Sequence, residues 1–246
     1  MTKPHLTLFA LLFAVGCSGS PTAPTVTAPP PVVVVTPPVA VVPPVVTPPV
    51  VAAPNPLLSD PRFNLSFYRQ MALNGFESPA ALWPLRRQTT APRIYLRTIH
   101  DNGTPIDALT LNETAAALIN TTGSLTGVFG LAGLEKGTST RAGQPGWITV
   151  SWKDDPERRY CGYAGFASDW IELYTNTPGC RCPGGPAVRL NTVKHELGHA
   201  LGFYHTDRPT DLMFQGGSAC DMNPSDREVF AARVAYSQPL GSFDPK

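Results

Sequence analysis

The sequence predicts a mixed α/β (α+β) domain, with a mixed sheet, a long helix and a C-terminal helix. Two observations predict this fold class. Short segments in which apolar and polar residues alternate, as in strands, are interleaved with segments that have helical spacing or capping pairs. The strongest helical signals come after the last strand signals along the chain. An all-β sandwich is excluded, because its sequence would show strands throughout.

Two helices are expected in the first half of the globular part. The pair Asp60-Pro61 is typical of a helix start, because Asp is a good N-cap and Pro suits the first helical position. Gly75 is expected to end this helix. The capping-box pattern Thr110–Glu113 predicts a second helix, which runs to about Asn120.

Strands are expected where side chains alternate, because successive residues of a strand point to opposite faces of the sheet. The segments with this pattern are 93–99, 147–152, 160–167 and 170–174. A long helix is expected over 187–202. A second capping box, Ser225–Glu228, predicts a C-terminal helix to about Tyr236.

Charge and proline content restrict the function and the organisation of the chain. Among 246 residues, 19 Lys and Arg balance 18 Asp and Glu, which argues against a nucleic-acid partner. Residues 21–54 consist only of Pro, Val, Thr and Ala, and such a run stays extended and solvated. We interpret 18–56 as a linker that holds a domain away from a membrane, with passive low-complexity filler as the alternative. About 190 residues remain, enough for one domain with its own core.

The N-terminus is typical of an export signal. Met1–His5 carries a Lys and precedes the apolar stretch Leu6–Val15, which is too short to span a membrane. The segment Ala14–Cys17 resembles the bacterial lipobox, although Ala14 stands where Leu is usual. The resemblance implies that 1–17 is a lipoprotein signal and that lipid on Cys17 anchors the exported protein to the cell envelope, at the outer membrane or the cell surface. Secretion without lipid is the alternative.

The chemistry is indicated by the motif His195-Glu196-Leu197-Gly198-His199, followed by Gly202 and His205. Residues four apart in a helix lie on one face, so His195 and His199 can bind one metal ion together. Gly202 lets the helix end, and His205 can then turn back as a third ligand. Catalytic zinc takes three protein ligands and keeps a fourth position for water, for which Glu196 is the expected general base.

This motif resembles that of the metzincin zinc metallopeptidases. The residues at its variable positions are most similar to those of the matrixin branch. Asp211-Leu212-Met213 resembles the Met-turn of that family, in which Met213 would pack beneath the zinc ligands. Astacins and serralysins place Tyr two residues after this Met; here the residue is Gln215, so a fifth ligand is not supported. The resemblance is sharp over Val193–Phe214. It is looser over 160–174 and the C-terminal helix.

The resemblance implies a metzincin-like zincin fold over 91–246, with a twisted, mostly parallel sheet above the zinc helix. One antiparallel edge strand of that fold binds extended peptide. The matching residues here are Gly162, Tyr163, Ala164, Gly165 and Phe166, with an ordinary core strand as the alternative.

Four cysteines remain besides Cys17. An even number in an exported domain predicts two disulfides. Cys180 and Cys182 are too close to pair comfortably, so one is expected to reach Cys161 and the other Cys220. A second zinc site that uses these cysteines is the alternative, and no C-x-x-C spacing supports it.

Two further features of the matrixin branch, an inhibitory pro-segment and bound calcium, have no supporting motif in this sequence. The pro-segment motif with which matrixins block their zinc is absent, so 57–90, an N-terminal helical segment, is left as either a short pro-region or a buttress. Calcium is common in the matrixin branch, but no motif supports it here. The acidic residues that could contribute are better explained as solvated loop carboxylates: Asp154, Asp155, Asp169 and Asp207.

The sequence thus predicts a monomeric, membrane-tethered zinc endopeptidase that hydrolyses peptide bonds of a peptide or protein substrate with a metal-activated water and Glu196 as general base. Two alternatives stay open: a zinc hydrolase of cell-wall peptide or another amide, and a non-catalytic surface binding module.

Overall fold

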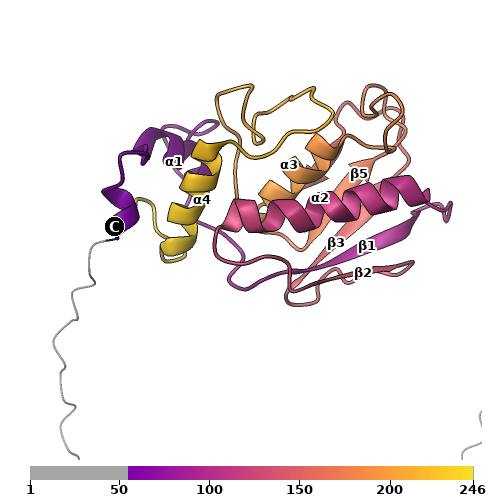
Figure 1. Ribbon diagram of the computed structural model, residues 1–246, viewed down its shortest axis with the longest axis horizontal. Coiled ribbons are helices and arrows are strands. Elements are labelled where there is room, and N and C mark those ends of the chain that lie inside the picture. Colours follow the sequence, from indigo (N-terminus) through magenta and orange to yellow (C-terminus); the bar gives the residue numbers. More distant parts are fainter. Residues whose placement is uncertain (1–54, 246) are drawn as a thin grey trace, which may run out of the picture. The chain divides into compact units, whose positions relative to one another are not determined.

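The computed structural model describes residues 55–245 (Figure 1). The predictions for the signal peptide, for Cys17 and for the linker up to residue 54 lie outside the described residues. Within 55–245, no helix is both long and apolar enough to cross a membrane.

One mixed sheet of five strands forms the centre of the described chain, in the order β2-β1-β3-β5-β4. The first four strands in this order are parallel to one another, and β4 pairs antiparallel with β5 at the edge. The mixed α/β class predicted from sequence is confirmed. The strands are β1 (Arg93–His100), β2 (Gly133–Gly137), β3 (Trp147–Lys153), β4 (Gly162–Ala164) and β5 (Trp170–Tyr174).

Four α-helices and one short 3₁₀-helix accompany the sheet in the described chain. They are η1 (Pro56–Leu58), α1 (Leu65–Leu73), α2 (Ala108–Thr126), α3 (Leu190–Leu201) and α4 (Asp226–Ser237). The helices α2 and α3 lie side by side on one face of the sheet, and α1 packs beside α4 (Figure 1).

The core forms where α2 and α3 meet the sheet. Val150 and Trp152 of β3 are buried on the core face, and Thr149, which points to the other face, is buried as well. Leu118 of α2 and Leu197 of α3 are fully buried in the same hydrophobic cluster. Each buried leucine contributes roughly 1.5–3 kcal/mol relative to exposure. His195 and His199 therefore lie on a helix that packs against the sheet.

The segment 57–90 packs into this same core. Met71, Leu73 and Leu85 are buried within the same hydrophobic cluster as the sheet and α3. The Tyr204 N–H, just beyond α3, donates to the Met71 carbonyl oxygen at 2.7 Å. The segment therefore packs against α3 and the chain that follows it, and its assignment as a pro-region or a buttress stays a prediction.

Two predicted helix starts are wrong for the same reason. The Asp60 carboxylate accepts the Arg62 N–H and guanidinium, so Asn64 instead caps α1 by accepting the Phe67 N–H. The Asp107 carboxylate caps α2 and accepts both the backbone N–H and the hydroxyl of Thr110. In both helices an oxygen other than the predicted one caps the first turn. Helix α2 also continues beyond Asn120, to Thr126, and four residues of this extension are buried: Thr121, Thr122, Leu125 and Thr126.

Other boundaries differ by a few residues. The helix predicted over 187–202 begins only at Leu190, and the strand predicted over 160–167 is limited to Gly162–Ala164. Strand β2 was not predicted, because Gly133–Gly137 shows no clear alternation; its parallel pairing with β1 alone defines it. The second capping box is confirmed, since Ser225 and Glu228 cap α4 reciprocally.

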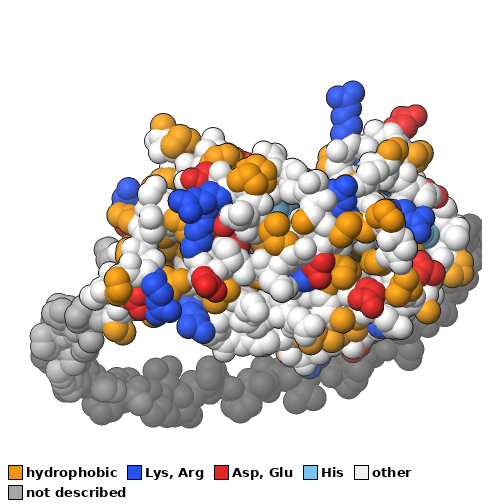
Figure 2. Space-filling model, turned by 45° about the horizontal axis from the view of Figure 1, so that its top comes forward, with side chains coloured by type: hydrophobic (Ala, Val, Ile, Leu, Met, Phe, Trp, Pro, Cys, Tyr) orange, Lys and Arg blue, Asp and Glu red, His pale blue; other side chains and the backbone are white. Residues whose placement is uncertain are grey.

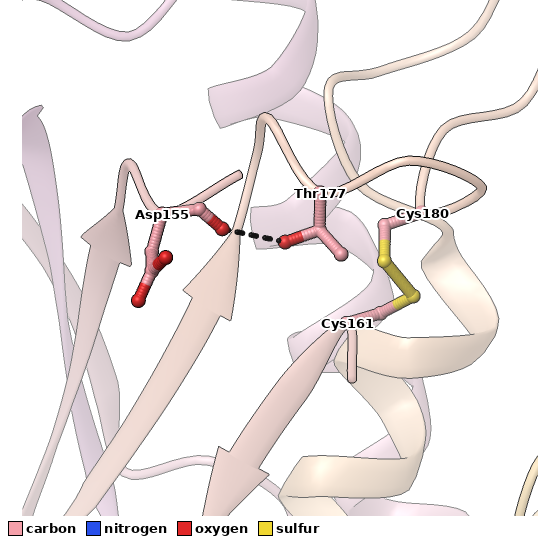
Figure 3. Close-up of a disulfide and its surroundings, with 4 residues drawn as sticks. All are labelled: Asp155, Cys161, Thr177 and Cys180. Atoms are coloured by element: carbon pink, nitrogen blue, oxygen red, sulfur yellow. Dashed lines mark hydrogen bonds between the residues drawn. A yellow bond between two sulfur atoms is a disulfide. The ribbon is translucent and has the colours of Figure 1, made fainter. Parts of the chain in front are cut away.

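Both predicted disulfides are present. Cys161, directly before β4, pairs with Cys180, and a Thr177 hydroxyl that donates to the Asp155 carbonyl oxygen fixes the neighbouring loops (Figure 3). Cys182 pairs with Cys220 across 38 residues that include α3 and all three histidines of the motif. In the chain-entropy picture, each bridge stabilises the fold by about 2–4 kcal/mol.

Candidate metal centre

The three histidines of the motif come together. His195 and His199 lie one turn apart on α3, and His205 follows the end of this helix. One ring nitrogen from each lies within 4.8 Å of the other two, and within 55–245 no other group of three or more His, Cys, Asp and Glu side chains is arranged to hold a metal ion. The convergence predicted from the spacing is therefore present.

Hydrogen bonds orient two of the rings through backbone carbonyls. The Nδ1 of His195 lies 2.8 Å from the Leu212 carbonyl oxygen, and that of His199 lies 2.7 Å from the Phe203 carbonyl oxygen. Because a carbonyl only accepts, each Nδ1 carries the proton, which leaves Nε2 with its lone pair. Burial also lowers the pKa of His195 to about 4 and that of His199 well below its usual range. Neutral imidazole is the form that binds a metal ion.

The chemistry of these nitrogens fits a metal ion. The Nε2 atoms of His199 and His205 face each other at 3.2 Å. The Nδ1 of His205 lies 2.5 Å from the Glu77 carboxylate, which accepts a hydrogen bond from it. In the neutral form of both rings, two lone pairs thus face one another with no hydrogen between them. A cation between them removes this repulsion.

Glu196 lies beside the histidines and has no partner of its own. Its side chain is 6% exposed, and no hydrogen bond or ion pair within 55–245 reaches its carboxylate. Burial raises the pKa of Glu196 to about 8. A Cβ on Gly162 would lie 2.6 Å from the Glu196 Cγ, so only glycine lets β4 pass this close. A buried carboxylate without a partner is costly to the fold and is typical of functional sites.

Met213 packs against α3 at Gly198. A Cβ on Gly198 would lie only 2.3 Å from the Met213 sulfur. The glycine therefore lets the turn that carries Met213 approach α3 closely. The Leu212 and Met213 N–H groups donate to the two oxygens of the buried Glu228 carboxylate at 3.0 and 2.8 Å. The same turn supplies the carbonyl that orients His195. Glu228 of α4 therefore holds the turn whose carbonyl orients His195.

The end of α3 depends on Gly202, whose φ of +112° is a conformation that other residues rarely adopt. A Cβ there would also overlap the Arg86 carbonyl oxygen. We expect Gly202→Ala to lower the free energy of unfolding by more than the about 1–3 kcal/mol that strained φ alone costs. Urea denaturation checks this value.

Gly143→Ala is the matched control for Gly202→Ala. Gly143 also has a positive φ, of +76°, but its Cβ would meet open space. Replacing Gly143 with Ala is expected to lower the free energy of unfolding only by the cost of the strained backbone, about 1–3 kcal/mol. Equal losses for the two variants would mean that the contact with Arg86 does not shape the helix end.

The predicted substrate strand lies at the edge of the sheet beside this site. β4 pairs only with β5 in the described chain, so its other edge has no strand partner. Tyr163 is 54% exposed, whereas Ala164 is buried. Gly165 follows the strand, and the Phe166 ring lies 5.0 Å from the His199 ring, centroid to centroid.

The acidic residues considered for calcium do not come together. Asp154 accepts hydrogen bonds from Asn102 and Asn176, and the others bond elsewhere: Asp155 pairs with Arg158, Asp169 accepts the Gly143 N–H, and Asp207 pairs with Arg227. The surface shown in Figure 2 also mixes basic and acidic side chains without a single-sign patch.

Sequence reasoning missed two residues of this centre. Glu228 was identified only as a helix cap, although its carboxylate also holds the turn of Met213. Glu77, which contacts His205, had no local signal, because it lies in a loop far from the motif.

Neither a protein-family model nor a curated protein sequence matches this chain.

Proposed function

We propose that this protein is a zinc-dependent endopeptidase of the metzincin type, closest to the matrixin branch. The observation that carries the proposal is three converging imidazoles beside Glu196, a buried carboxylate without a partner. A structural zinc site uses four protein ligands, whereas three histidines leave one position for chemistry. This favours an enzyme over a non-catalytic binding module.

The residues of the chain have distinct tasks in this proposal. His195, His199 and His205 hold the metal ion through Nε2. When bound, zinc acts as a Lewis acid that activates water and polarises the scissile carbonyl. Glu196 accepts the proton of the attacking water and passes it to the leaving amine, so no Ser or Cys nucleophile is needed.

The free edge of β4 is an argument for an extended peptide as the substrate. An extended peptide can add to this edge as another strand, because the N–H and C=O groups there have no strand partner in the described chain. Tyr163 and Phe166 would then border the bound chain. We also propose that the protein is exported and held at the cell envelope through Cys17, as its N-terminal sequence indicates.

The test incubates the full purified chain with a mixed peptide library, with and without a zinc chelator. Internal cleavage products are expected only without the chelator, and added zinc should restore them. Products that appear equally in both samples would overturn the metallopeptidase proposal. Cleavage restricted to cell-wall peptides would favour the alternative amide hydrolase.

A further inference from the structure

The third histidine is oriented by a residue far from the motif. The Nδ1 of His205 lies 2.5 Å from the Oε1 of Glu77, 128 residues earlier in the chain. The other two histidines use backbone carbonyls for the same purpose. His205 is therefore the only one of the three whose ring is held by a charged side chain.

Glu77 is held in place by the loop that follows α1. Asn74 ends this helix with a left-handed backbone, and the next N–H, of Gly75, donates to the Arg69 carbonyl oxygen at 2.8 Å. The Ser78 N–H donates to the Asn74 carbonyl oxygen at 2.9 Å, which closes a turn around Glu77. The loop is thus shaped by backbone hydrogen bonds on both sides of the carboxylate.

The same segment is tied to the chain around His205. Tyr204, its neighbour, donates its N–H to Met71 of α1 and packs its ring 5.8 Å from the Trp83 ring, centroid to centroid. The carboxylate of Glu77 and the ring of His205 are consequently brought together by several contacts besides their own. Glu77 is exposed and the His205 side chain is 14% exposed, so it is the backbone contacts around both residues that keep the pair together.

We propose that Glu77 is a positioning residue of the metal centre, whose carboxylate fixes the tautomer and the orientation of His205. This inference rests on the proposed zinc site. A carboxylate that accepts the second N–H of a metal-binding histidine keeps the lone pair on the other nitrogen and makes it a better ligand. This role of Glu77 also makes the segment 57–90 part of the functional domain, so removal of the segment would weaken metal binding.

The test measures zinc affinity of the full chain by competition with a chromophoric chelator. Loss of such a carboxylate typically weakens metal affinity 10–100-fold, and we expect a loss of about this size for Glu77→Ala. Glu77→Gln retains an oxygen that accepts the Nδ1 proton but lacks the charge, so an intermediate loss is expected. The absorption spectrum of the cobalt-loaded Glu77→Ala protein should also differ from that of the wild type, because the third ring is no longer held.

Asp244→Ala provides the matched control. Asp244 pairs with Arg69 of α1 at 2.8 Å, so this variant removes a carboxylate that contacts the same segment without touching a ligand. Its zinc affinity is expected to equal that of the wild type. An equal loss in Asp244→Ala and Glu77→Ala would overturn the positioning role, because general loosening of the segment would explain both.

The outcomes separate this inference from the proposed function. Wild-type zinc binding and cleavage, with Glu77→Ala and Glu77→Gln both within twofold of wild-type affinity, overturn only the role of Glu77. A wild-type chain that binds no zinc overturns both. If Glu77→Ala does not fold, Glu77→Gln decides, since its side chain has the same shape.

Discussion

Replacing Glu196 with Gln is expected to lower kcat/KM for peptide hydrolysis by about 10²–10⁴-fold, the usual contribution of a general base. The amide has nearly the same volume as the carboxylate but cannot accept the proton of the attacking water. Volume matters here, because the side chain lies in the narrow space beneath Gly162 and beside Thr192 of α3. The measurement is steady-state cleavage of a peptide identified in the library experiment.

Zinc content provides the control for Glu196→Gln. Glu196 is not among the three ligands, so the variant is expected to bind one zinc ion per chain, as the wild type does. The matched variant His199→Ala should lose both the ion and the activity. A Glu196→Gln protein that cleaves peptide at the wild-type rate would remove this residue from the mechanism.

Replacing Glu228 with Ala is expected to lower the free energy of unfolding by about 3–5 kcal/mol, the cost of breaking a buried charged network. The Glu228 side chain is fully buried and accepts hydrogen bonds from Leu212, Met213 and Ser225. Its removal leaves these buried N–H groups without an acceptor. Burial raises the pKa of Glu228, and the donated N–H groups oppose this shift.

The Glu228→Ala variant should also bind zinc more weakly. The carbonyl of Leu212 orients His195, and the N–H of the same residue is held by Glu228. Urea denaturation with a chelator present measures the stability loss alone, and zinc competition then measures the effect on the metal centre.

Glu113→Ala is the matched control for Glu228→Ala. Glu113 occupied the equivalent position in the first predicted capping box, but it is exposed on α2. Its substitution is expected to change stability by no more than about 0.5 kcal/mol. A loss below about 1 kcal/mol for Glu228→Ala would mean that the turn of Met213 does not depend on this carboxylate.

The two capping boxes show how far local sequence determines structure. Both have the same pattern, yet only Ser225–Glu228 forms, because Asp107 lies three residues before Thr110 and caps α2 first. The capping-box pattern indicates which residues are able to cap a helix. In α2 the Thr110 N–H and hydroxyl both donate to Asp107, so the helix begins before the predicted box.

The sequence alone determined the arrangement of the candidate metal ligands on the chain. The spacing of His195 and His199 is one turn of a helix, and Gly202 marks the point at which the chain turns toward His205. These relations are local, so helix geometry and the conformational freedom of glycine are enough to predict them.

Only the tertiary structure decided what surrounds those ligands. The contact of Glu77 with His205 joins residues 128 positions apart, and the pairing of Cys161 with Cys180 rather than with another cysteine depends on how loops meet. Strand β2 exists through its pairing with β1. Local sequence patterns do not predict such contacts, because these contacts form only when the packed core brings distant segments of the chain together.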